Sequence, residues 1–342
     1  MWQHLSPLHE LRFLQELYLK NMIGLEYISD TEITDEISTS SASSFFPALK
    51  SLKLWDCPNL KGWWKSDIIE VNIDNDQGDL ATRASTSSQH ISLPSFHSLS
   101  YLYIRNCMRL TCMPLFPNLE EGLILSNANL KPLQQTVEMT MNMTTASSLY
   151  SSSSLPLSNL KSLSLFYMQD IESLSEDWLQ KLTSLECLHI WMCPRLKFLS
   201  RSMQLLTSLK KLEIGDCEEV DLINDKSDNG TKWLTRLQEL RLTNFPCLLT
   251  LPEWIGNLKL LQILKIDNFP KLISLPEWIG NLKSLQKLEI YLCPELTSLP
   301  EGMRKLVSLQ CLEIIYCPHL KERCQKEMSE AWLARVPIFR ND

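Results

Sequence analysis

Glycine is scarce in this chain, and the motifs that depend on glycine are missing. Nine glycines occur in 342 residues, and none belongs to G-x-x-x-x-G-K-[ST], G-x-G-x-x-G or G-x-S-x-G. These motifs hold phosphates or expose a nucleophilic serine, so phosphoryl transfer, dinucleotide chemistry and serine hydrolysis lack sequence support. The six histidines are scattered, and no C-x-x-C pair or Cys/His zinc spacing occurs. We therefore expect no catalytic residue, no cofactor, no metal site and no enzyme.

Long apolar runs and an excess of basic residues are missing as well. No window approaches the roughly 18 apolar residues of a membrane-spanning helix. The opening MWQHLSPLHELRFLQEL lacks the apolar core of a secretory signal. Lys and Arg number 33 against 40 Asp and Glu, which leaves no basic stripe to follow a phosphate backbone. We expect no membrane span, no nucleic-acid ligand, and a cytoplasmic or alternatively nuclear location.

Leucine, in contrast, recurs with a fixed period. The pattern L-x-x-L-x-[LI]-x-x-[CNF]-x-x-L-x-x-L begins at Leu237, Leu261, Leu285 and Leu309, and the interval between these starts is constant. A period of about 20–29 residues with this spacing is the leucine-rich repeat, one strand and one returning segment per turn of a solenoid. The segments L-P-E-W-I-G-N-L at 251–258 and 275–282 predict a short helical turn with its apolar residues facing inward.

Eleven repeats can be traced along the chain, the fourth of them degenerate. They begin at Leu14, Leu49, Leu99, Leu119, Leu160, Leu185, Leu209, Leu237, Leu261, Leu285 and Leu309. The fold class expected is therefore α/β: a leucine-rich repeat solenoid with a curved parallel β-sheet on the concave face and short helices and loops on the convex face. We expect this solenoid over residues 1–320 and a capping segment over 321–342.

Three polar, low-complexity stretches interrupt the repeats, near residues 30–44, 66–90 and 136–154. Their composition cannot bury enough apolar surface to balance the entropy of ordering, so we expect loops that protrude from the solenoid.

The eleven cysteines follow the repeat. Six of them occupy the same position just after the predicted strand: Cys57, Cys107, Cys193, Cys217, Cys293 and Cys317. Met, Ala or Phe takes this position in other repeats, which argues against obligatory disulfides. We expect small buried thiols in a reducing compartment.

Outward-facing positions of the predicted strands carry several aromatic and basic residues. An exposed sheet face that keeps such residues has the composition of a protein-binding hot spot, although aromatic residues also simply favour strands. The candidate protein-binding residues of the concave face are Trp55, Tyr101, Tyr103, Arg105, Phe166, Tyr167, His189, Trp191, Met192, Arg241, Lys265, Tyr291 and Tyr316.

Two stretches carry a family resemblance: EWIGNLKSLQKLEI, and CPHLKERCQKEMSEAW, which begins at Cys317. They resemble the C-terminal leucine-rich region of plant nucleotide-binding disease-resistance proteins of the coiled-coil class. The resemblance implies a non-catalytic recognition module of innate immunity, whose partner is a pathogen effector, a host target or a nucleotide-binding receptor module. Without a phosphate loop, we expect recognition without the nucleotide-binding domain. A leucine-rich repeat adaptor or substrate receptor of a ubiquitin-ligase complex is the alternative.

The cysteine pattern makes a prediction about reduced thiols. After denaturation, thiol counting should find nearly all eleven cysteines free, and a reducing agent should leave the melting temperature unchanged. A loss of several degrees on reduction would show that disulfides constrain the chain.

Overall fold

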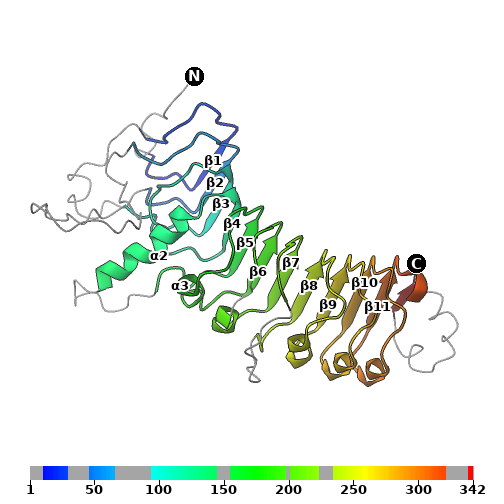
Figure 1. Ribbon diagram of the computed structural model, residues 1–342. Helices are drawn as coiled ribbons and strands as arrows, with labels where there is room; N and C mark the ends of the chain where they lie inside the picture. The colour runs from blue at the N-terminus through cyan, green and yellow to red at the C-terminus, as the bar shows by residue number, and fades with distance from the viewer. Residues whose placement is uncertain are drawn as a thin grey trace, which may run out of the picture. The chain divides into compact units, whose positions relative to one another are not determined.

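Every leucine repeat contributes one short strand to a parallel sheet, as the spacing predicts. The computed structural model describes residues 11–29, 46–65, 94–144, 155–197, 201–222, 234–320 and 338–341. The chain divides into two units, Met1–Leu119 with Ala128–Pro156, and Glu120–Asn127 with Leu157–Asp342. Figure 1 shows successive strands side by side within each unit.

The strands follow one another in sequence order. In the first unit they are β1 (Glu16–Lys20), β2 (Ser51–Trp55) and β3 (Tyr101–Cys107). In the second unit they are β4 (Gly122–Ala128), β5 (Ser162–Phe166), β6 (Cys187–Trp191), β7 (Lys211–Gly215), β8 (Glu239–Thr243), β9 (Ile263–Asp267), β10 (Lys287–Tyr291), β11 (Cys311–Ile315) and β12 (Ile338–Asn341). All eleven predicted repeats therefore have their strand, and the fold is a leucine-rich repeat solenoid.

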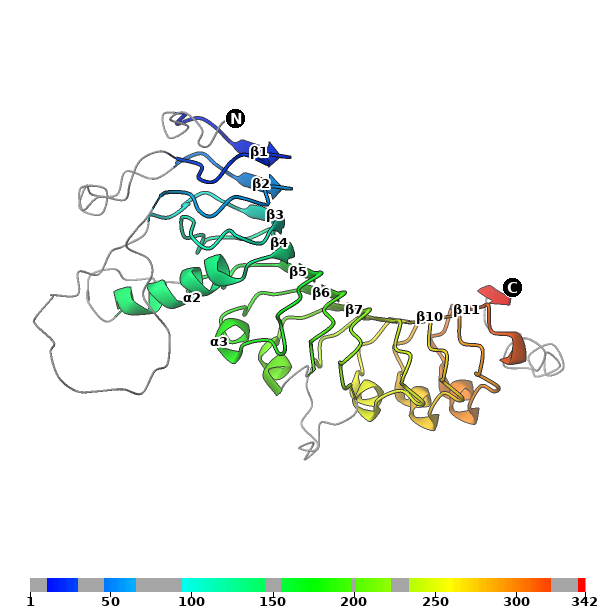
Figure 2. The same ribbon diagram turned by 45° about the horizontal axis from the view of Figure 1, so that its top comes forward.

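Short helices form the returning segments of the second unit. They are α3 (Glu176–Leu179) and the 3-10 helices η2 (Arg201–Leu205), η3 (Glu253–Asn257), η4 (Glu277–Asn281) and η5 (Glu301–Lys305). Figure 2 shows them along one side of the strands. The predicted helical turns of 251–258 and 275–282 are thus confirmed as η3 and η4, with Ile255 and Ile279 fully buried.

The core is built by equivalent residues of consecutive repeats stacking in register. Leu240, Leu264, Leu288 and Leu312 are Cα partners across β8 to β11, and none of them exposes any surface. A parallel sheet keeps such a row together because neighbouring strands are only about 4.8 Å apart. Burying one leucine contributes about 1.5–3 kcal/mol, so the row of stacked side chains is the main source of stability.

Two glycines allow neighbouring 3-10 helices to approach closely. A Cβ on Gly280 would lie 2.3 Å from the carbonyl oxygen of Gly302, and one on Gly302 would lie 2.3 Å from that of Glu277. The Glu277 carboxylate accepts a hydrogen bond of 2.7 Å from the backbone N–H of Gly302. Part of the chain's sparse glycine is therefore used where helices η4 and η5 pack.

One expected loop is wrong over part of its length. Residues 136–144 continue α2 (Lys131–Thr144), in which Leu133, Thr136 and Val137 are buried. The polar composition of 136–154 did not reveal this helix, because an amphipathic helix needs only one apolar stripe. The expected loops 30–44 and 66–90, residues 145–154 and residues 321–337 of the expected cap lie outside the described residues.

The expectation of small buried thiols is confirmed for the shared cysteine position. All six of these cysteines are buried and free. Their Sγ atoms donate to backbone carbonyls two residues earlier, for example from Cys293 to Tyr291 at 3.2 Å and from Cys107 to Arg105 at 3.3 Å. The thiol therefore supplies a weak donor to a turn carbonyl while filling a small buried space.

The stacked core leads to a matched pair of substitutions. Leu264→Ala should lower the free energy of unfolding by roughly 2–5 kcal/mol because it leaves a cavity in the row. Lys265→Ala, one residue along β9, should cost less than about 1 kcal/mol, since its ion pair with Asp267 is on the surface. Urea denaturation of both variants checks this, and equal midpoint shifts would contradict the register.

Candidate functional site

The strand face of each unit is the surface made by the outward side chains of its strands. Side chains alternate along a strand, so the residues between the buried leucines face away from the core. Because the strands pair in register, outward residues of consecutive repeats also form rows across the sheet. In the second unit, Ser164, His189, Glu213, Arg241, Lys265, Glu289 and Glu313 form such a row.

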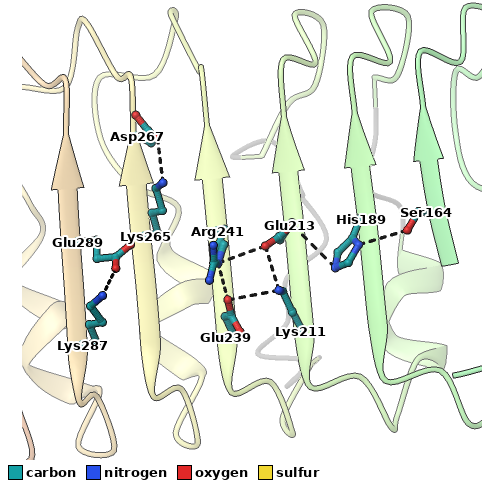
Figure 3. Close-up of polar contacts among 10 residues, drawn as sticks. All are labelled: Ser164, His189, Lys211, Glu213, Glu239, Arg241, Lys265, Asp267, Lys287 and Glu289. Atoms are coloured by element: carbon teal, nitrogen blue, oxygen red, sulfur yellow. Dashed lines mark hydrogen bonds and ion pairs between the residues drawn. The ribbon is translucent and has the colours of Figure 1, made fainter. Parts of the chain in front are cut away.

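Ion pairs connect the outward side chains of β7 and β8 (Figure 3). The Glu213 carboxylate lies 3.2 Å from Lys211 Nζ and 3.2 Å from Arg241 Nε. Glu239 also pairs with Arg241 and lies 3.6 Å from Lys211. Each charge therefore has opposite charges on its own strand and on a neighbouring one, which fixes the side chains as a network rather than as separate pairs.

A similar set of contacts covers β9 to β11. Lys265 pairs with Asp267 at 3.1 Å and lies over the Tyr291 ring at 4.9 Å. The Tyr291 hydroxyl donates to Glu313 at 2.5 Å, and burial together with this hydrogen bond raises the pKa of Tyr291 above its ordinary value. Lys287 pairs with Glu289, also drawn in Figure 3. This part of the strand face is therefore polar, internally paired and close to neutral.

His189 is held between polar neighbours of two strands. Its Nδ1 lies 3.2 Å from Ser164 Oγ, and its Nε2 lies 3.8 Å from Glu213 without a hydrogen bond (Figure 3). Burial lowers the pKa of His189 below its ordinary 6.5, although Glu213 acts in the opposite direction. The lowered pKa favours the neutral form of the imidazole at pH 7.

Two aromatic residues lie beside this network. Phe166 and Trp191 are Cα partners at the ends of β5 and β6, so they occupy equivalent positions on neighbouring repeats. A Cβ on Gly215, the next residue of this row, would lie 2.8 Å from the Trp191 ring. The absence of a side chain on Gly215 therefore lets the indole lie over β7.

The corner residue after each strand has a left-handed backbone. Asn and Asp, which tolerate positive φ, occupy this position after β7 to β9, where Asn244 donates to Asp216 at 2.5 Å and Asn268 to Asn244 at 3.0 Å. Asn127 takes it at the end of β4, and bulky apolar residues take it in the remaining repeats of the second unit. They are Tyr167, Met192, Leu292 and Tyr316, with 46%, 38%, 46% and 68% of their surface exposed.

This geometry corrects the predicted positions of three candidate residues. Tyr167, Met192 and Tyr316 were expected to point outward from strands, but they lie one residue beyond the ends of β5, β6 and β11. The reason is that each strand ends where the backbone turns left-handed towards the buried position of the repeat. These side chains therefore border the strand face instead of belonging to its rows.

The remaining four candidates lie on the first unit. Trp55, Tyr101, Tyr103 and Arg105 are outward residues of β2 and β3. Trp55, Tyr101 and Tyr103 line a hollow of about 350 Å3 together with residues that the sequence did not single out. Four of the thirteen candidates therefore lie on the first unit and nine on the second.

Sequence reasoning missed most of the charged network. Lys211, Glu213, Glu239, Lys287 and Glu313 were not candidates, although they occupy outward positions beside the leucines of their strands. The signal was opposite charge at equivalent positions of two consecutive repeats, Lys211 with Glu239 and Glu213 with Arg241. On the first unit, the outward residues Glu16, Tyr18 and Lys53 were not candidates either.

The described part of the chain shows neither a cluster of metal-ligating residues nor a membrane-spanning helix. No group of three or more His, Cys, Asp or Glu residues is arranged there to hold a metal ion. The described helices are also too short or too polar to cross a bilayer.

Comparison with known proteins identifies structures of the same repeat class. No family model matches the sequence. The search of curated proteins also finds no match. Among solved structures, the chain is similar to the leucine-rich repeat domain of the type III effector XopL, with 21% identity, a TM-score of 0.39, and coverage of 93% of this chain and 74% of that one.

Two further structures are similar at comparable levels. A leucine-rich repeat protein of Leptospira interrogans has 19% identity and a TM-score of 0.40, covering 98% of this chain and 93% of that one. An internalin from Listeria monocytogenes has 15% identity and a TM-score of 0.37, covering 96% and 87%. At these values the comparisons describe the repeat fold and carry no conclusion about function.

The half-buried His189 leads to a pH prediction. Because the pKa of His189 is lowered in the folded state, the unfolded chain takes up this proton at a higher pH than the folded chain does. The free energy of unfolding therefore decreases as the pH falls through 6.5. Relative to His189→Gln, the wild type should lose at most about 1.4 kcal/mol between pH 7.5 and 5.5. Urea denaturation of both proteins at the two pH values cancels the other titrating groups, and a constant difference would refute the lowered pKa.

Proposed function

We propose that this chain is a non-catalytic protein-recognition module that binds its partner through the strand face of the second unit. Phe166 and Trp191 are the proposed anchors, with Tyr167 and Met192 beside them. Aromatic side chains supply much of the binding energy in protein interfaces, where a single residue can contribute about 2 kcal/mol. The neighbouring network of charges supplies orientation and selectivity.

This proposal rests on one observation: bulky apolar residues occupy corner positions whose left-handed backbone is energetically unfavourable for them. A left-handed backbone costs a residue with a Cβ about 1–2 kcal/mol, and Asn or Asp lowers that cost at other corners. Tyr167 and Met192 adopt this left-handed conformation on consecutive repeats, and their side chains are exposed. Strained, exposed apolar residues are typical of binding sites, and here they adjoin the aromatic pair.

The ion-pair network supports the same reading. Lys211 and Arg241 are balanced by Glu213 and Glu239, so a partner that covers the network does not desolvate an unpaired charge. Their side chains are held before the partner arrives, which reduces the entropy lost on binding. A rigid, neutral platform beside aromatic anchors suits a folded protein surface.

The biological setting proposed is plant innate immunity. The support is the resemblance of the stretches at 277–290 and 317–332 to the leucine-rich region of plant disease-resistance proteins. The partner proposed is accordingly a pathogen effector, a modified host protein or a nucleotide-binding receptor module, met in the cytoplasm or nucleus. No described feature favours the ubiquitin-ligase alternative.

Replacement of the anchors tests the proposal. A photo-crosslinking residue at position 166 should capture a partner in an extract of the tissue that expresses the chain. The identified partner, once purified, should bind the wild type saturably and bind Phe166→Ala/Trp191→Ala at least tenfold more weakly. Isothermal titration calorimetry measures both affinities.

A matched control carries Leu260→Ala and Val307→Ala, which remove exposed apolar side chains from the turns before β9 and β11. This control should bind like the wild type, and circular dichroism should show both variants folded. Equal binding by the anchor variant and the wild type would refute the proposed face.

A further inference from the structure

The strand face of the first unit is a three-by-three array of outward side chains. In register across β1, β2 and β3, the rows are Glu16, Ser51, Tyr101; then Tyr18, Lys53, Tyr103; then Lys20, Trp55, Arg105. Trp55 contacts Tyr18 and Tyr103, with ring centroids 6.3 Å and 6.2 Å apart. Four aromatic rings therefore gather on three strands.

These rings border a hollow of about 350 Å3. Its lining includes Glu16, Tyr18, Lys53, Trp55, Tyr101 and Tyr103. The volume is at the lower end of the roughly 300–1,000 Å3 of ligand pockets, which suits one or two side chains of a peptide rather than a large cofactor.

Two lysines of this array lie over aromatic rings, and so does Arg105. Lys20 Nζ lies 4.2 Å and Arg105 Cζ lies 5.1 Å from the Trp55 centroid, while Lys53 Nζ lies 5.7 Å from the Tyr101 centroid. Neither Lys20 nor Lys53 forms an ion pair with a described residue. In the second unit, by contrast, the outward Lys211, Arg241, Lys265 and Lys287 all pair with carboxylates.

Charge on the array is therefore unbalanced. Its nine positions hold three cations and one carboxylate, Glu16. Counted with the nearby Asp56, which accepts a hydrogen bond of 2.5 Å from the neutral Asn106 amide, the cations still exceed the carboxylates by three to two. Lysines over exposed rings gain only about 0.5–1 kcal/mol from each contact, so a carboxylate can engage them at little cost.

We infer that this array binds an acidic, aromatic-containing peptide segment of a protein partner. The aromatic side chain of the segment stacks among Tyr18, Trp55 and Tyr103 in the hollow. Flanking Asp or Glu carboxylates pair with Lys20 and Lys53 at its border. The rings supply contact area and the lysines select the charge of the segment.

Two other ligands fit the array less well. A cationic side chain would meet net positive charge and would compete with Lys20 and Arg105, which already occupy the Trp55 ring. A single-stranded nucleic acid could use both rings and cations, but it needs a basic groove along several phosphates. The chain has a net charge of −7, and the three cations of the array are too few to form such a groove.

The inference is separate from the anchors proposed on the second unit. It concerns different residues in a different unit, so either assignment can fail alone. Phe166→Ala/Trp191→Ala should therefore leave binding at this array unchanged.

Fluorescence anisotropy tests the inference with a labelled peptide of alternating Glu and Tyr residues. The full chain should bind it saturably, and more weakly as salt is raised because exposed charges are screened. The double variant Lys20→Met/Lys53→Met should bind at least tenfold more weakly, as should Trp55→Ala. The matched control is Lys61→Met, which removes one lysine of the same unit that is paired with Glu26 and lies outside the array; it should bind like the wild type.

Three comparison probes make the outcome decisive. A peptide with Lys in place of Glu, one with Ala in place of Tyr, and a single-stranded oligonucleotide should each bind at least tenfold more weakly than the acidic peptide. The inference is overturned if the lysine peptide or the oligonucleotide binds more tightly. It is equally overturned if the wild type shows no saturable binding, or if the double lysine variant, folded by circular dichroism, binds unchanged.

Discussion

In-register stacking of inward leucines is the interaction on which the rest of this structure depends. Each repeat buries too little apolar surface to be stable alone, so it requires the equivalent residues of the repeats beside it. The backbone enforces the same register. Gln262 donates to the carbonyl of Gln238, Gln286 to that of Gln262, and Gln310 to that of Gln286, at 2.7 to 2.8 Å. Side chains and backbone thus agree on one spacing.

The same constraint creates the two proposed binding surfaces. Once the leucines fix the strands, the residues between them are aligned in rows that have no part in the core and can vary in chemistry. The second unit uses these rows for paired charges around Glu213 and for the aromatic pair Phe166 and Trp191. In the first unit the same rows hold aromatic side chains, and Lys20 and Arg105 lie over the Trp55 ring. One backbone plan therefore carries two surfaces of different character.

The sequence was informative wherever the repeat governs the structure. Leucine spacing located all eleven strands, and the shared cysteine position correctly predicted buried, free thiols. It failed where a single residue changes the backbone. Tyr167 has a left-handed backbone and lies just beyond the end of β5, and the leucine pattern does not predict that conformation for a tyrosine. Helix α2 escaped notice because Leu133 and Val137 form a narrow stripe in a polar segment. Pairings such as that of Glu213 with Arg241 depend on register between repeats, which composition alone does not reveal.

Amide hydrogen exchange, followed by mass spectrometry of overlapping peptides, tests the stacked register most directly. Over residues 234–320 the account predicts slow exchange at β8, β9, β10 and β11, recurring once in every repeat, with faster exchange in the turns between them. Protection that does not follow the repeat, or long protected stretches typical of extended helices, would contradict the account.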